Sequence, residues 1–238
     1  MKKLVGIVSL LAILLVVLPG PLYKWGIVEL GTAFAGIRFG VYAGAAALIL
    51  LIVQLIFMRK NTHWPMAGIS AIFAVIAIAL PLSLMNKAKS VPPIHDISTD
   101  VVAPPPFVKI AELRADAPNP IEYSGAETAA AQLKAYPELV TLKYANSKND
   151  VFIAAKEVVN QFGWELVNAD ASQGIIEATD TTAWFGFKDD VVIRIKSLET
   201  VTLVDIRSKS RVGKSDLGKN AQRINDFIKQ INQSLSAI

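Results

Sequence analysis

The sequence predicts an α+β protein with three N-terminal transmembrane helices, followed by an α+β domain with a four-stranded antiparallel sheet packed against helices. Three apolar runs fill the first part of the chain, a proline-rich stretch follows, and the second half alternates short β-type runs with amphipathic helical patterns. Only 18% of the 238 residues are charged. A soluble domain carries about 25%, so the composition also favours a membrane protein.

The three apolar runs lie in a transmembrane region of residues 1–90. They cover about residues 4–22, 35–58 and 65–85. About 20 helical residues cross the ~30 Å hydrocarbon core of a bilayer, so each run suffices for one span. The first run has an alternative interpretation as a secretory signal, because Lys2 and Lys3 precede it. No small-x-small cleavage pattern follows it, and a retained span is therefore expected.

Positive residues beside the spans give the orientation, since they favour the cytoplasmic side. Lys2 and Lys3 abut the first span, and Arg59 and Lys60 lie in the very short loop between the second and third spans. We therefore expect a cytoplasmic N-terminus. Three crossings then place everything after Lys89 outside the cytoplasm.

Residues 91–106 are expected to be a proline-rich linker, because consecutive prolines favour extended chain and cannot continue a helix. Residues 107–238 then form the soluble α+β domain. Residues 1–90 hold eight Lys or Arg and one acid, whereas residues 91–238 hold sixteen against nineteen. The pI near 9.2 thus belongs to the membrane half, and it does not indicate a nucleic-acid partner.

The first element predicted in the soluble domain is a helix that begins after Ser147 and ends at Gly163. Four strands are predicted at residues 164–170, 175–181, 191–196 and 201–207, and their short connections favour an antiparallel meander. A final helix, with Ser215 as its expected N-cap, carries the apolar stripe Leu217, Ala221, Ile224, Ile228, Ile231 and Leu235. The core is expected to contain Phe152, Phe162, Ile193, Val204, Ile224 and Ile228.

A basic run between the last strand and the last helix is the candidate site for an anion or a partner. Its members are Arg207, Arg211, Lys214, Ser215 and Arg223. Cationic side chains around the free N–H groups of a helix start attract anions. The alternative is that these charges are solvated or form structural pairs, such as Arg211 with an acid of the sheet. Arg194 and Asp205 are expected to form such a pair.

Gly213-Lys214-Ser215 is similar to the end of a P-loop, but Ser208 stands where that motif needs its first glycine. Nucleotide hydrolysis is therefore not expected. A second candidate surface is the aromatic loop of Trp184, Phe185 and Phe187. This loop either forms an exposed lip for a ligand or membrane surface, or closes one end of the core.

The chain offers few groups for catalysis or metal binding. It has no cysteine and two histidines, His63 and His95, which disfavours a thiolate zinc site and a Ser-His-Asp triad. Asp189 and Asp190 are adjacent, so on a strand they would point to opposite faces, and a turn is expected there. We expect no catalytic residue, metal or cofactor. The alternative is a hydrolase that uses loop carboxylates and serines, for which one pocket would have to join Asp189, Asp205, Arg207 and Ser215.

Residues 94–231 resemble the family called domain of unknown function 1499. The motifs are Ile94-His95-Asp96-Ile97-Ser98-Thr99-Asp100, Ile176-Glu177-Ala178-Thr179, Trp184-Phe185-Gly186-Phe187-Lys188-Asp189-Asp190-Val191, Arg194-Ile195, Val204-Asp205-Ile206-Arg207-Ser208 and the run from Ser210 to Ile224. The resemblance implies a bacterial envelope or plastid setting, and no catalytic residue. We therefore expect a multi-pass protein of the bacterial inner membrane with a periplasmic domain. Its expected partners are the lipid bilayer and an anionic ligand, a lipid headgroup or an envelope protein. The oligomeric state is left open.

Overall fold

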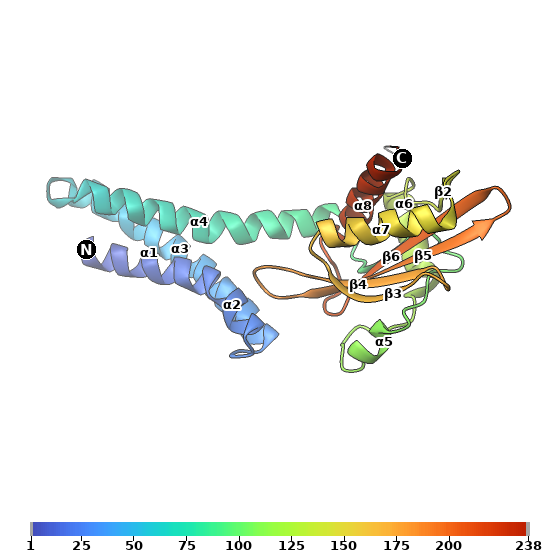
Figure 1. Cartoon of the computed structure of the whole chain (residues 1–238). Helices are drawn as coiled ribbons and strands as arrows, with labels where there is room; N and C mark the ends of the chain where they lie inside the picture. The colour runs from blue at the N-terminus through green and yellow to red at the C-terminus, as the bar shows by residue number, and fades with distance from the viewer. Residues whose placement is uncertain (1, 237–238) are drawn as a thin grey trace. The chain divides into compact units, whose positions relative to one another are not determined.

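The computed structural model describes residues 2–236, which form two compact units (Figure 1). The first unit contains the N-terminal helices up to Lys89 together with Ala183–Gly186. The second contains the rest of the described chain from Ser90 onward. Each unit is described separately below.

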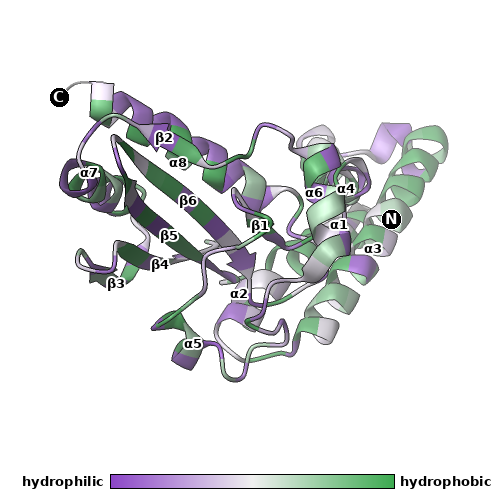
Figure 2. Ribbon diagram, turned by 90° about the vertical axis from the view of Figure 1, so that its right-hand side faces the viewer, coloured by the Kyte–Doolittle hydropathy of each residue, from purple (hydrophilic) through white to green (hydrophobic). Residues whose placement is uncertain are grey.

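The first unit is helical and strongly apolar, as the hydropathy colouring of α3 shows in Figure 2. Its elements are α1 (Lys2–Val17), α2 (Pro19–Lys24), α3 (Leu30–Phe57), the 3-10 turn η1 (Arg59–Asn61) and α4 (Trp64–Ser90). Three segments are long and apolar enough to cross a membrane: Lys3–Lys24, Leu30–Phe57 and Trp64–Ser90. The three apolar helices predicted from the sequence are thus confirmed.

Small residues let these helices approach closely. A Cβ atom added at Gly40 would lie 2.6 Å from Val16 Cγ2, and one added at Gly44 would lie 3.1 Å from the carbonyl oxygen of Ala74. Glycine therefore removes a clash at both positions, as small residues do in tightly packed membrane helices.

The second unit is built on one antiparallel sheet of six strands, in the order β1-β6-β5-β4-β3, with β2 also paired to β6. The strands are β1 (Asp96–Ser98), β2 (Leu142–Tyr144), β3 (Glu165–Asp170), β4 (Ile175–Thr181), β5 (Lys188–Leu198) and β6 (Val201–Ser210). The helices are α5 (Ile110–Leu113), α6 (Gly125–Ala135), α7 (Lys148–Gln161) and α8 (Lys219–Ser236). The fold class is α+β as predicted, but the expected count of four strands is wrong.

The two additional strands are short and pair with different parts of β6. Strand β1 pairs with Arg207–Lys209, and β2 pairs with Thr202–Val204. Each has three residues, too few to show the alternation that marks a strand in a sequence. Residues 91–106, expected to be a linker, thus contribute β1 to the sheet.

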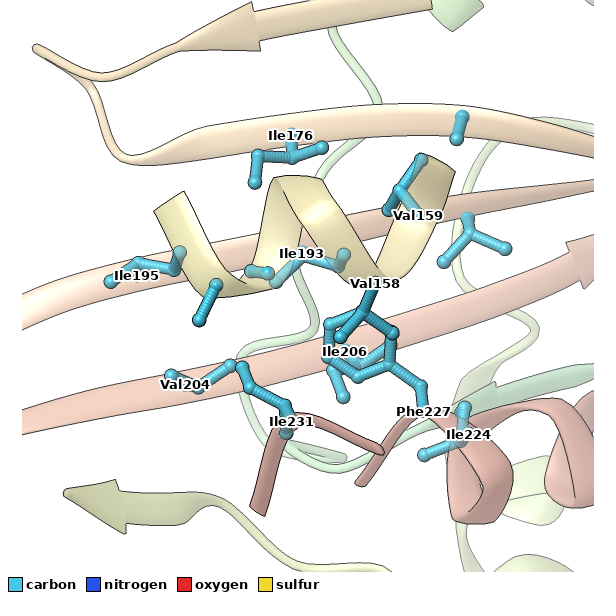
Figure 3. Packing of buried hydrophobic residues seen from close by; sticks show 14 of the residues in the cluster. Val158, Val159, Ile176, Ile193, Ile195, Val204, Ile206, Ile224, Phe227 and Ile231 are labelled. Carbon is cyan, nitrogen blue, oxygen red and sulfur yellow. The ribbon is translucent and has the colours of Figure 1, made fainter. Parts of the chain in front are cut away.

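Helices α7 and α8 cover one face of the sheet and enclose the main hydrophobic core (Figure 3). Its labelled members are Val158, Val159, Ile176, Ile193, Ile195, Val204, Ile206, Ile224, Phe227 and Ile231. Of the six predicted core residues, four are buried: Phe152, Ile193, Val204 and Ile224. Phe162 is 38% exposed because it follows the last residue of α7, and Ile228 is only partly buried. Phe227 takes the place expected for Ile228.

The two helix starts differ in how well the sequence predicts them. Ser147 caps α7 as predicted, its Oγ accepting a hydrogen bond from the Asp150 N–H at 3.2 Å. Ser215 does not cap α8, which begins four residues later because Leu217 and Gly218 adopt positive φ angles of 58° and 76°. The Asp216 carboxylate takes the capping role and accepts from the Asn220 N–H at 2.6 Å.

Candidate functional site

The sheet face opposite α7 and α8 carries a network of charged side chains, called here the sheet network. Antiparallel register places Thr179, Asp190, Lys209 and Asp96 side by side on β4, β5, β6 and β1. The segment that includes α5 packs over this face through Phe107 and Ile110. Charges that are solvated on many sheets are therefore buried on this one.

Asp96 holds two cations of the sheet network. Its Oδ1 accepts from Arg207 Nε at 2.9 Å, and its Oδ2 accepts from Lys209 Nζ at 2.9 Å. Burial alone would raise the pKa of Asp96, but the hydrogen bond and charge of Arg207, and then those of Lys209, outweigh it, so this pKa lies below its ordinary value. The Arg207 guanidinium also stacks 4.8 Å from the centre of the Phe107 ring.

Asp190 holds two further cations. Arg114, from the end of α5, donates from Nη1 to Asp190 Oδ2 at 2.7 Å. Arg211 donates to both oxygens at 2.8 Å, and the Thr179 hydroxyl donates to Oδ1 at 2.7 Å. The pKa of Arg114 is lowered by burial, against the opposing effect of Asp190. Arg211 is thus paired with an acid of the sheet, as one alternative had anticipated.

Arg194 completes the sheet network. It donates to Asp205 at 2.7 Å and to Asp100 at 2.8 Å. The predicted pair of Arg194 with Asp205 is therefore confirmed. The five cations of this face, Arg114, Arg194, Arg207, Lys209 and Arg211, pair with Asp96, Asp100, Asp190 and Asp205. Glu177, a fifth buried acid of this face, accepts from backbone N–H groups and from Asn168, and it brings the number of acids to five. Because its charges cancel, the sheet network is suited to holding the fold together rather than to attracting an anion.

Arg223 lies on the other face of the sheet, on α8. It donates to Asp180 and to Asp189, each at 2.7 Å, and its Nη1 donates to Ser208 and Asn220. With the bond from Nε to Asp180, all five N–H groups of the guanidinium are used. Burial lowers the pKa of Arg223, but Asp189 and Asp180 outweigh it, so the pKa is raised overall.

Asp189 and Asp190 both lie within β5, so the turn expected there is wrong. The reason is that β5 begins three residues earlier than predicted, at Lys188, where it continues the pairing with β4. The alternation of a strand does send the two carboxylates to opposite faces, one to Arg223 and the other to Arg211. Asp189 and Asp205 likewise lie on opposite faces, so no single pocket can use both.

The candidate residues of the basic run are therefore not assembled in one place. Arg207 and Arg211 belong to the sheet network, and Arg223 lies across the sheet from them. Lys214 is exposed in the loop before α8, and the Ser215 hydroxyl accepts from the Leu217 N–H at 3.3 Å. The electrostatic argument from the sequence counted these cations without the carboxylates that face them.

The aromatic loop is also divided. Trp184 and Phe185 belong to the first unit, where the indole N–H of Trp184 donates to the Val17 carbonyl at 2.9 Å and Phe185 lies 5.7 Å from the Phe34 ring. Phe187 belongs to the second unit, where its N–H donates to the Thr182 hydroxyl at 2.9 Å. The three residues of this loop are thus divided between the two units.

An open groove, called here the α8 groove, lies where α7 ends beside the first turns of α8. It has a volume of about 240 Å³ and is lined by Phe162, Trp164, Asp180, Lys219, Gln222, Arg223 and Asp226. Packing orders the aromatic side of the groove. The ring centre of Trp164 lies 6.2 Å from that of Phe227, on which it stacks, and 5.1 Å from that of Phe162. Asp180 is about one-third exposed. Of the lining residues, sequence reasoning had singled out Arg223 and the expected core residue Phe162.

A family model described as "Protein of unknown function (DUF1499)" matches residues 96–231, which is more than half of the chain. The chain belongs to the DUF1499 family. The match confirms the resemblance drawn from the motifs of residues 94–231. No curated protein matches the chain.

The DUF1499 match begins at the first residue of β1 and ends inside α8. It therefore includes the sheet network and every residue of the α8 groove, and it leaves out the three apolar helices. Among residues 2–236, no group of three His, Asp or Glu side chains is placed to hold a metal ion. The α8 groove offers a ligand charged and aromatic groups on its walls.

Proposed function

We propose that this protein is a membrane-anchored binding protein whose DUF1499 domain holds a small polar ligand, such as a lipid headgroup, in the α8 groove. One observation carries the proposal. The cations of the sheet network are buried and matched by acids, whereas the groove is open and has a partly exposed carboxylate beside aromatic rings. Three helices apolar enough to span a bilayer would hold the domain near lipid headgroups.

Among the described residues that line the groove, one cation is available for an anionic part of the ligand. All five N–H groups of Arg223 are already used, so Arg223 cannot bind a further acceptor without losing a present one. Lys219 is exposed at the first residue of α8 and lines the groove. We therefore assign a ligand phosphate to Lys219. The hydrolase alternative lacks this support, because Asp189 and Asp205 lie on opposite faces of the sheet.

Titration calorimetry on the full chain in dodecyl maltoside micelles tests the proposal. Glycerophosphoethanolamine, a soluble form of a headgroup, is expected to give saturable heat. Gln222→Trp should abolish this heat by filling the groove, because Gln222 is an exposed lining residue. Lys229→Trp is the matched control, since Lys229 is exposed on the same helix but does not line the groove. Equal binding by the two variants, or none by the wild type, would contradict the proposal.

We further propose that the membrane is the bacterial inner membrane and that the DUF1499 domain is periplasmic. Alkaline phosphatase fused after Ile238 is expected to be active, and a fluorescent protein fused there to be dark. The reason is the cationic loop at Arg59 and Lys60, which favours the cytoplasm, followed by one further span. Fusions after Lys60 should give the reverse pattern. A bright C-terminal fluorescent fusion together with an inactive phosphatase would refute this topology.

A further inference from the structure

We infer that the α8 groove binds an organic ammonium group, so that its ligand is an amine or a zwitterion with an ammonium end. This inference rests on the proposed function, because it names the chemistry of the ligand at the same groove. Three features of the groove carry it: its charge, its aromatic wall and its size.

Counted together with Asp189, which pairs with Arg223, the groove has three carboxylates against two cations. Asp180 and Asp189 share the single guanidinium of Arg223, and Asp226 adds another carboxylate to the lining. Lys219 and Arg223 are the two cations of the lining, so the lining alone is balanced, and the excess of one negative charge comes from Asp189, which pairs with Arg223 but does not line the groove. The sheet network has no such excess.

The pKa of the neighbouring carboxyl group of Asp216 reflects the negative charge of Asp189. Burial raises the pKa of Asp216, and the negative charge of Asp189 adds to the rise against hydrogen bonds from Asn220 and Gly218, which lower it. A cation entering the groove would be attracted by the charge that raises this pKa. An anion would be repelled by this negative charge, and Lys219 would be the remaining cation able to bind it.

The aromatic wall suits an ammonium group. Trp164 is held parallel to Phe227, with an angle of 18° between the rings, so its orientation is fixed. Phe162 lies 5.1 Å from Trp164 and is exposed beside it. Aromatic faces attract cations through their quadrupole. Trp164 is only 9% exposed and stacks on Phe227, so the Phe162 ring is the main aromatic surface that a cation in the groove would meet. Rings of this kind beside carboxylates are the means by which proteins bind quaternary and primary ammonium ions.

Asp180 is the carboxylate best placed to face such a group. Both hydrogen bonds from Arg223 go to its Oδ2, and within the described residues Oδ1 accepts none. Arg223 thus positions Asp180 at the end of β4 without consuming both oxygens. The volume of about 240 Å³ is below the roughly 300–1,000 Å³ of sites for drug-sized ligands, so it suits a headgroup-sized molecule.

Calorimetry on the full chain in dodecyl maltoside micelles tests the inference with ethanolamine, choline and inorganic phosphate as separate probes. The two amines are expected to bind. Asp180→Asn should weaken their binding about tenfold or more by removing the charge while keeping the shape of the side chain. Glu157→Gln is the control, because it removes an exposed charge outside the α8 groove. Trp164→Phe, which keeps an aromatic ring, should weaken amine binding more mildly and decides the matter if Asp180→Asn fails to fold.

The probes separate this inference from the proposed function. Binding of glycerophosphoethanolamine and phosphate without the amines would overturn the ammonium site and leave the proposed function standing. Absence of all binding would overturn both, as would equal binding of every probe by the wild type and the Gln222→Trp variant. Amine binding that survives both Asp180→Asn and Trp164→Phe would overturn the inference. If the amines bind, their affinities are compared with that of glycerophosphoethanolamine. Tighter binding of glycerophosphoethanolamine identifies a lipid headgroup as the ligand, and tighter binding of a free amine identifies a soluble ligand.

Discussion

Alanine in place of Phe227 is expected to lower the free energy of unfolding of the DUF1499 domain by about 3–5 kcal/mol. The Phe227 side chain is completely buried among the core residues of Figure 3, and its ring stacks on Trp164. Its removal would leave a cavity between α8 and the sheet and would remove the support of one wall of the α8 groove. A urea titration of the full chain in dodecyl maltoside micelles, followed by the loss of the β-sheet circular dichroism signal, measures the effect.

Ile228→Ala is the matched control, because Ile228 is the next residue of the same helix and is only partly buried. We expect a loss about half as large or less, since the burial of a side chain scales its contribution to stability. A greater loss for Ile228→Ala than for Phe227→Ala would mean that α8 presents to the core the stripe predicted from the sequence. The comparison thus tests which face of α8 packs against the sheet.

The rotation of α8 illustrates what the sequence could and could not predict. The apolar period identifies the helix, and Ala221, Ile224, Ile231 and Leu235 are buried as predicted. The start of the helix is set by backbone conformation instead. Leu217 at φ 58° is an unusual position for a leucine, and no local pattern announces it. The predicted helix start at Ser215 therefore placed Leu217 in the apolar stripe, although Leu217 lies before α8.

The sheet shows the same division between local and long-range information. Strands β3 to β6 each have at least six residues and are joined by short turns, so their patterns are visible locally. Strands β1 and β2 have three residues each and form only because β6 offers its edge to them. Both strands therefore depend on long-range pairing. In β1, Ser98 pairs with Arg207, about a hundred residues further along the chain, and in β2, Leu142 pairs with Val204, about sixty residues further along.

The site was hardest to predict, because a charged residue in a sequence carries no sign of its partner. Arg114 and Asp190, 76 residues apart, meet at 2.7 Å. The groove brings together residues from the end of α7, the end of β4 and the start of α8, and no motif joins them. The available signal was the aromatic pair Phe162 and Trp164 around the glycine that ends α7, a pattern that core packing also explains.

Asp96→Ala is expected to lower the free energy of unfolding by about 3–5 kcal/mol, because it leaves Arg207 and Lys209 buried without their carboxylate. The same urea titration measures it. Asp100→Ala is the control, since Asp100 also pairs with a cation of the sheet network but its side chain is 22% exposed. Water can replace part of that lost interaction, and the expected loss is at most about 1 kcal/mol. Equal losses for the two variants would contradict the buried character of the Asp96 pairs.

The pH dependence of stability gives the Asp96 pairs a second test with a definite sign. The pKa of Asp96 in the folded protein lies below its ordinary value near 3.8, so the carboxylate contributes stability that is fully present above that value. The contribution is lost as the pH falls through the lowered pKa, because protonation then removes the charge that Arg207 and Lys209 require. The wild type should therefore lose more stability than Asp96→Ala on acidification below about pH 4. A parallel loss in both proteins would mean that Asp96 is not the group through which acid opens the sheet network, and that Arg207 and Lys209 are held by their backbone acceptors instead.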